Sequence, residues 1–166
     1  MRPVRTINSW TCFPASVASI LHLDLQTLFT ILGHDGSEFV RESDGLMGRR
    51  GFHPQEMIQV AQNRHFSVTQ IDRLPSARPT LEHSFCYFKT IVGEDCELRF
   101  DRQLFQSFGW IECRTQRGTG HAIAYDNATL FDPSTGEAFK YQSVQDAESR
   151  GLYLLSLFRL DSMENS

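Results

Sequence analysis

The stretch that decides the fold is Asn8-Ser9-Trp10-Thr11-Cys12-Phe13-Pro14-Ala15-Ser16-Val17-Ala18, which places a cysteine just ahead of a run of small and apolar residues. The larger apolar side chains of that run recur on one side, so we predict a helix over residues 15–22. A helix N-terminus carries about half a positive charge, and that charge stabilises a thiolate. The segment therefore makes Cys12 a candidate nucleophile, whereas most free cysteines are small buried hydrophobes.

Outward from this segment, the chain predicts two more helices. Asp24 is a suitable N-cap for a helix over Leu25–Leu32, and Gly33 is a suitable residue to end it. A proline suits the first position of a helix, which favours a helix over residues 54–64. The polar and glycine-rich stretch 35–51 between these helices is predicted to be a loop.

The second half of the chain predicts antiparallel strands. Alternating or continuous apolar runs indicate five strands, at Phe66–Asp72, 110–114, 121–125, 129–131 and 152–160. Residues 132–136 have turn composition, residues 74–79 are predicted to cross the surface, and residues 81–108 give no clear pattern. Helices that come early and antiparallel strands that come late indicate an α+β fold. We expect a single domain over residues 1–166.

His121 opens one of the predicted strands, directly after Gly120. Glycine at that place would let the backbone and a substrate approach each other closely. A two-residue turn at Asp126-Asn127 would bring Asp132 opposite His121 in the next strand. A carboxylate there would fix the imidazole tautomer and favour the imidazolium. We therefore predict that His121 is a base oriented by Asp132, the alternatives being a structural histidine and a plain Asp-Pro turn.

The composition limits the partners. The chain has 166 residues, of which 40% are hydrophobic and 22% charged, which is ordinary for a globular protein with one core. Its net charge of −4 disfavours a nucleic acid, whose phosphates need a basic face. No apolar run reaches the roughly 18 residues of a membrane span, and no signal peptide is evident. We expect no nucleic-acid or membrane partner, and a cytoplasmic location or delivery by a dedicated secretion route. The oligomeric state is open.

Cysteine and histidine spacing gives no metal site. The four cysteines, at positions 12, 86, 96 and 113, contain no CxxC pair. The six histidines show neither HxxxH nor HExxH spacing, and no glycine-rich phosphate loop is present. His34-Asp35-Gly36 could form a metal or catalytic pair, but its place after a helix-ending glycine favours a turn. We therefore expect no metal and no cofactor.

The order of these motifs resembles that of the papain-like cysteine hydrolase clan. The segment Trp10-Thr11-Cys12-Phe13-Pro14-Ala15-Ser16 is similar to the Cys-Gly-Pro-Ala-Ser helix start of the clan, and His121-Ala122-Ile123-Ala124-Tyr125 with Phe131-Asp132-Pro133 is similar to its histidine strand and Asp-Pro turn. The resemblance is closest to C39-like peptidases and to related bacterial effector proteases and glutamine deamidases. It implies a papain-like fold, with Cys12 on an N-terminal helical lobe and with His121 and Asp132 on a C-terminal antiparallel sheet.

Two departures from the clan pattern concern the oxyanion hole. Phe13 follows the cysteine where glycine is usual, and Thr6 stands where the clan commonly has a glutamine that donates to the oxyanion. The nearest side-chain amide is that of Asn8. We therefore assign the oxyanion hole to the Cys12 backbone N–H and the Asn8 amide, with Thr6 as the alternative to Asn8.

Trp10, Phe13 and Gly120 flank the candidate nucleophile and base, and we assign them to a substrate slot, although the two aromatic residues could equally belong to the core. The function that we favour is hydrolysis of a peptide or isopeptide bond in a protein or peptide substrate, through a thioester on Cys12. A protein-glutamine deamidase on the same fold is the alternative, and a non-catalytic papain-like binding module is the third possibility. A protease needs a groove on both sides of the scissile bond, whereas a deamidase needs a slot for one side chain.

Overall fold

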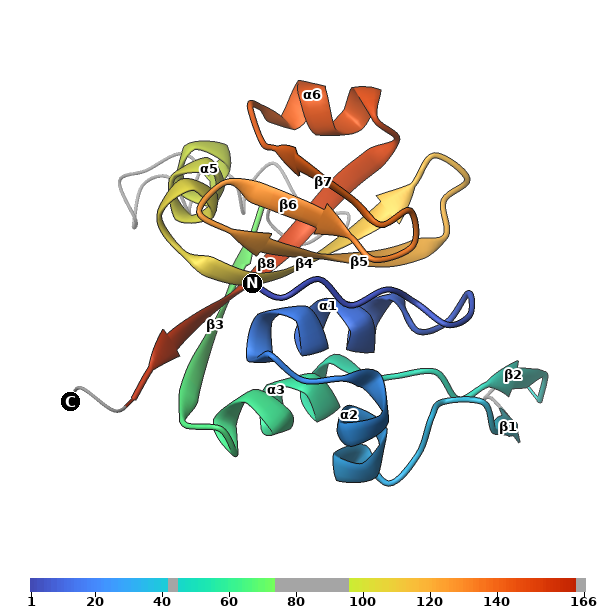
Figure 1. Ribbon diagram of the computed structural model, residues 1–166. Helices are drawn as coiled ribbons and strands as arrows, with labels where there is room; N and C mark the ends of the chain where they lie inside the picture. Colours follow the sequence, from blue (N-terminus) through green and yellow to red (C-terminus); the bar gives the residue numbers. More distant parts are fainter. Residues whose placement is uncertain (42–44, 74–95, 164–166) are drawn as a thin grey trace.

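The computed structural model describes residues 1–41, 45–73 and 96–163, and its centre is an antiparallel sheet (Figure 1). The strands of this sheet run in the order β3-β8-β4-β5-β6-β7, and each neighbouring pair is antiparallel. Their bounds are β3 Phe66–Asp72, β4 Phe108–Thr115, β5 Gly120–Asp126, β6 Thr129–Asp132, β7 Glu137–Lys140 and β8 Leu152–Ser162.

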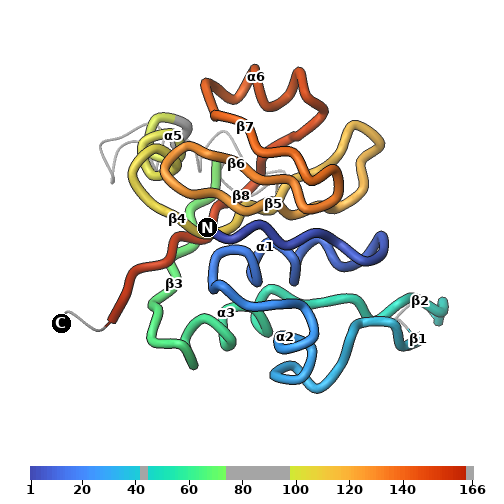
Figure 2. Tube along the Cα trace, viewed as in Figure 1, coloured from blue at the N-terminus to red at the C-terminus, as the bar shows by residue number. Residues whose placement is uncertain are grey.

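Helices cover both faces of the sheet (Figures 1 and 2). On one face lie α1 (Cys12–Leu21), α2 (Leu25–Leu32) and α3 (Pro54–Gln62), which form a hydrophobic core with sheet residues such as Trp110 and Phe158. On the other face lie α5 (Cys96–Gln106) and α6 (Val144–Ser149), whose apolar residues pack with Ile111 and Ile123 in a second core. The expected α+β fold, with an N-terminal helical part and a C-terminal antiparallel sheet, is confirmed.

The central helix α1 begins at Cys12, earlier than the predicted start at residue 15. Its N-cap residue Thr11 makes no side-chain cap, because the Thr11 hydroxyl instead bonds to the backbone of Ile7 and Asn8 in the preceding loop. Residues 14–21 of the helix are all buried, since α1 packs between the sheet and the two outer helices. This burial, rather than a capping side chain, fixes where Cys12 lies.

The other two early helices follow the sequence signals. In α2, the Asp24 carboxylate accepts a hydrogen bond from the Thr27 N–H, and Gly33 ends the helix with a φ of 77°. In α3, Pro54 is the first residue, and His53 forms a reciprocal capping box with Glu56. The end of α3 at Gln62 lies before the predicted end at residue 64.

Part of the predicted loop 35–51 is wrong, because it contains a two-stranded hairpin. Strand β1 (Phe39–Arg41) pairs antiparallel with β2 (Met47–Arg49), and this sheet is separate from the large one. The predicted surface connection at 74–79 lies outside the described residues, as does most of the unassigned stretch 81–108, whose last part forms α5 and the start of β4.

The predicted hairpin turn at Asp126-Asn127 is also wrong, by one residue. Asp126 pairs with Thr129, so the turn residues are Asn127 and Ala128, both with positive φ. Two positive φ values give the type of turn whose twist matches that of the flanking strands, and asparagine tolerates this conformation well. In the observed register, Asp132 falls two residues along the strand from His121 on the same face, rather than directly opposite it.

Membrane-spanning potential is limited among the described residues. No single helix is long and apolar enough to cross a bilayer, and α1 and α2 meet the length and composition requirements only together, across a bend of 106°.

Candidate active site

Cys12 and His121 come from the two halves of the fold. Cys12 is the first residue of α1, and His121 lies at the start of β5, the strand on which α1 packs. Both side chains line the same cavity, and Cys12 is one of the groups that raise the pKa of His121. The fold thus brings together two residues that are more than 100 positions apart in the chain.

Asp132 completes this group at the end of β6. Its Oδ1 lies 3.0 Å from His121 Nε2, and only 7% of the His121 side chain and 12% of the Asp132 side chain are exposed. Asp132 Oδ1 also accepts a hydrogen bond from the Ser134 N–H at 2.8 Å, in the turn that the sequence predicts after β6. Because Nε2 faces Asp132, Nδ1 is the ring nitrogen left for Cys12.

The electrostatics of the pair favour the ionised forms. Burial lowers the pKa of His121, but hydrogen bonding and charge from Asp132 and Cys12 outweigh burial and raise it to about 9. Burial raises the pKa of Asp132, but the His121 ring and the backbone N–H groups of Ser134 and Thr135 outweigh it and hold that pKa below its usual range. The imidazolium-carboxylate pair is therefore stable at neutral pH.

The N-terminus of α1 offers hydrogen-bond donors beside the Cys12 sulfur. The first N–H groups of a helix have no partner within the helix, and here Thr11 supplies no side-chain cap. The third helical residue is Pro14, which has no N–H, so the backbone N–H groups of Cys12 and Phe13 are the two donors of this first turn. Donors in this place can stabilise an oxyanion that forms next to the sulfur.

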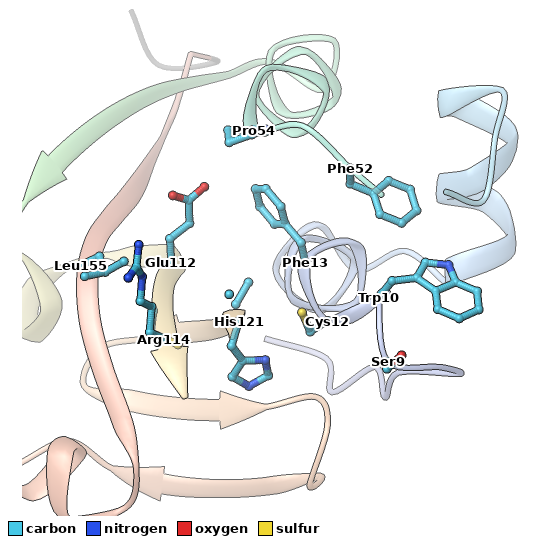
Figure 3. Close-up of a pocket in the computed structure, with 13 residues that line it drawn as sticks. Ser9, Trp10, Cys12, Phe13, Phe52, Pro54, Glu112, Arg114, His121 and Leu155 are labelled. Atoms are coloured by element: carbon cyan, nitrogen blue, oxygen red, sulfur yellow. The ribbon is translucent and has the colours of Figure 1, made fainter. Parts of the chain in front are cut away.

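A cavity of about 440 Å³ opens over Cys12 and His121 (Figure 3). Phe13 lies at its middle and packs on the buried Trp110, with ring centroids 6.1 Å apart. The lining continues to both sides of Cys12 (Figure 3), and we name its two ends by their side chains. The aromatic end is formed by Ser9, Trp10 and Phe52, and the charged end by Glu112, Arg114 and Leu155.

The aromatic end is held in place by contacts with the β1-β2 hairpin and the loop before it. Trp10 Nε1 donates a hydrogen bond to the Asp35 carbonyl at 3.2 Å, and the Arg49 guanidinium lies 3.9 Å from the Trp10 ring centroid. Phe52 stacks on Phe29 at 5.8 Å and on His34 at 5.2 Å. The segment that the sequence predicts as a loop is therefore a support for one end of the cavity.

The charged end is shaped by an irregularity between β4 and β8. The register shifts between Glu112, which pairs with Ser156, and Cys113, which pairs with Leu154. Leu155 is thereby left as an extra residue on β8, and such bulges re-aim the side chains next to them. Both Glu112 and Leu155 line the cavity (Figure 3).

The residues assigned to the substrate slot, Trp10, Phe13 and Gly120, all line the cavity. The residues assigned to the oxyanion hole, Asn8 and Thr6, are not among the described residues that line it. The Asn8 Oδ1 accepts a hydrogen bond from the Trp10 N–H at 3.2 Å, and the Thr6 N–H donates to the Pro133 carbonyl at 3.0 Å. These bonds place both residues in the loop that leads into α1, and an oxyanion role for either stays a prediction.

The sequence patterns do not predict the charged end. Glu112 stands within the apolar run Trp110-Ile111-Glu112-Cys113, and a lone carboxylate in a buried strand was the signal that could have found it. Cys113, beside it, is buried, and burial, with the nearby acidic groups, raises the pKa of its thiol well above the ordinary range. Within the described part of the chain, no three His, Cys, Asp or Glu side chains gather as metal ligands would.

Comparison with known proteins gives a likeness in fold. No protein-family model matches the chain, and no curated protein sequence does. Among solved structures, the chain is similar to one described as the crystal structure of a double glycine motif protease from an AMS/PCAT transporter in complex with the leader peptide. The TM-score is 0.53 at 12% sequence identity, and the match covers 98% of this chain and 92% of the other. The chain thus has a papain-like, C39-like α+β fold, as the sequence motifs imply.

Proposed function

We propose that this protein is a cysteine peptidase that cleaves a peptide or isopeptide bond in a peptide or protein substrate. The observation that carries the proposal is the position of His121, whose buried ring is hydrogen-bonded to Asp132 through Nε2 and which lines the same cavity as Cys12. A nucleophile, a base and an orienting carboxylate in this order are what acyl transfer needs. The cavity above them gives a substrate access to Cys12.

In the proposed reaction, Cys12 acts as a thiolate paired with the His121 imidazolium, and its Sγ attacks the carbonyl carbon of the scissile bond. The negative oxygen that forms is stabilised by the N–H groups at the start of α1. His121 then gives the proton to the leaving amine, and a thioester remains on Cys12. His121, now neutral, takes a proton from the water that hydrolyses the thioester, which restores the Cys12 thiolate and the His121 imidazolium.

The extent of the cavity favours peptide cleavage over glutamine deamidation. A deamidase admits one side chain, whereas a peptidase holds an extended chain on both sides of the reacting carbonyl. The lining residues lie on both sides of Cys12, from Trp10 at one end to Leu155 at the other (Figure 3). The protease with the similar fold is described in complex with a leader peptide, which supports a peptide as the substrate.

The test is incubation of the purified protein with a library of peptides and proteins, followed by intact-mass analysis. We expect new fragments with the wild type and none with Cys12→Ala. A mass change that matches Gln-to-Glu conversion without fragments would replace the peptidase by a deamidase. Neither product, together with a Cys12 thiol that does not react with iodoacetamide, would favour a binding module.

A further inference from the structure

Glu112 is a carboxylate in the cavity that the proposed chemistry does not use. It extends from β4 toward Pro54 and Phe13 at the charged end, on the far side of Cys12 from Trp10 (Figure 3). Its side chain is partly buried, and within the described residues it makes no hydrogen bond and no ion pair. A partly buried carboxylate without a partner has lost solvation that nothing in the protein replaces.

The surroundings of Glu112 strengthen this point. Burial raises the pKa of its carboxyl group, the charge of Asp72 raises it further, and His53 is the basic group that opposes them. Asp72 is engaged by the Ser156 hydroxyl at 2.6 Å, and His53 by the Gln55 N–H at 3.2 Å. Neither neighbour contacts Glu112 as a hydrogen-bond partner, so the carboxylate is available to a ligand.

Apolar surface next to Glu112 suits a long aliphatic side chain. Leu155 and Phe13 line the same cavity, and Leu155 is 43% exposed. Lysine and arginine bury their methylene stems along apolar surface while their charged heads reach a polar partner. A carboxylate at the end of an apolar wall therefore matches a cationic side chain in both shape and charge.

Arg114 is the competing charge at this end of the cavity. Its side chain is exposed, whereas that of Glu112 is partly buried. Charges in water are screened and contribute little to binding, whereas a partly desolvated charge interacts more strongly with a partner. The preference of Glu112 for a cationic substrate side chain should therefore outweigh the preference of Arg114 for an anionic one.

We propose that Glu112 makes the charged end of the cavity a subsite for a lysine or arginine side chain of the peptide substrate. The inference rests on the proposed peptidase function and adds a substrate preference to it. The subsite is formed by the Glu112 carboxylate for the charge and by Leu155 and Phe13 for the stem. The β4-β8 bulge supplies the geometry, because it turns Leu155 to the same side as Glu112.

The test uses internally quenched peptides in which one position at a time carries lysine, arginine, norleucine, glutamine or glutamate. At one position we expect peptides with lysine or arginine to exceed the norleucine peptide in kcat/KM by about tenfold or more. The free energy of one hydrogen bond to a charged group corresponds to a factor of about that size. Glu112→Gln keeps the size of the side chain and should abolish this ratio. Arg114→Gln is the matched control and should retain it.

Three results would overturn the subsite: no position with a cation preference, a preference that persists in Glu112→Gln, or a glutamate preference that Arg114→Gln removes. Thermal unfolding and iodoacetamide labelling of Cys12 show whether each variant is folded.

If the wild type cleaves no peptide, the peptidase function fails by itself. The subsite is then judged by binding, because Cys12→Ala should bind fluorescent lysine peptides more tightly than norleucine peptides, and Glu112→Gln added to Cys12→Ala should remove the difference. Equal binding would contradict the subsite.

Discussion

Two histidines of this protein are each bonded to a carboxylate at the same distance, yet their surroundings differ. His34 Nε2 lies 3.0 Å from Glu56 Oε1, and His121 Nε2 lies 3.0 Å from Asp132 Oδ1. Both rings are buried, with 9% and 7% of their side chains exposed. A buried histidine-carboxylate pair is therefore not by itself a sign of catalysis.

The second ring nitrogen separates the two pairs. His34 Nδ1 accepts a hydrogen bond from the Gly36 N–H at 3.1 Å, so both nitrogens of that ring are used within the protein. The His34 ring stacks on Phe52, and the Glu56 carboxylate that pairs with His34 also forms an ion pair with Arg50. Among the described residues, His121 Nδ1 accepts no such backbone hydrogen bond, and Cys12 lines the same cavity. The His34-Glu56 pair therefore supports Phe52 in the wall of the cavity, whereas the His121-Asp132 pair leaves one ring nitrogen available for proton transfer.

The largest difference that we expect between the two histidines is in the effect of their removal on turnover. His121→Ala should lower kcat/KM by about four orders of magnitude, because it removes the base. His34→Ala should leave kcat nearly unchanged and raise KM severalfold through a looser Phe52. Steady-state kinetics on a cleaved peptide would measure both variants. Equal losses in kcat would show that the two pairs do not differ in the way we describe.

The next contrast is in stability against pH. In the folded protein the pKa of His121 is about 9, above the 6.5 of an ordinary histidine, so the folded state holds a proton that the unfolded chain releases. The resulting stabilisation, up to about 3 kcal/mol, is fully present below pH 6.5 and is lost as the pH rises through 9. Urea unfolding across this window should show the decline in the wild type and a flatter curve in His121→Gln. A wild-type curve as flat as that of the variant would contradict the raised pKa.

A smaller effect is expected for the carboxylate partner. Asp132→Ala should lower kcat by about a hundredfold, which is less than the loss in His121→Ala, because an orienting group contributes less than the base. The same variant should bring the pKa of His121 down, since Asp132 is a main cause of its rise. NMR titration of the imidazole would measure this, and an unchanged pKa would remove Asp132 from the group.

The smallest effect is expected at the carboxylate of the other pair. Glu56 accepts hydrogen bonds from the His53 N–H at 2.8 Å and from Arg50 at 3.3 Å, in addition to its bond with His34. Glu56→Gln should therefore lower the free energy of unfolding by about 1–2 kcal/mol, as the loss of a capping box does. Denaturant unfolding would measure it, and the reactivity of Cys12 should not change.

The features that the sequence predicts are those fixed by neighbouring residues. Asp24, Gly33 and Pro54 mark helix ends through local capping chemistry, and each does so in the structure. The histidine strand and the turn after Asp132 likewise follow from local patterns. His121 and Asp132 meet although the turn at Asn127 is one residue later than predicted, because a long imidazole reaches a residue on the diagonal.

The features that escape prediction depend on contacts between distant segments. Strand β2 contains Gly48, a poor strand former, and pairs only because β1 lies beside it. Ala128 adopts a φ of 63°, which its type does not favour. The place of Glu112 depends on a bulge that forms only when β4 meets β8. Local patterns contain none of these pairings.

The central claim, that His121 activates Cys12, is tested most directly by alkylation. The protein is treated briefly with iodoacetamide at neutral pH, and the modified cysteines are mapped by mass spectrometry in the wild type, in His121→Ala and in His34→Ala. We expect Cys12 to react well before Cys86, Cys96 and Cys113 in the wild type and in His34→Ala, and to lose this advantage in His121→Ala. Preferential labelling of another cysteine, or an equal rate at Cys12 with and without His121, would contradict the account.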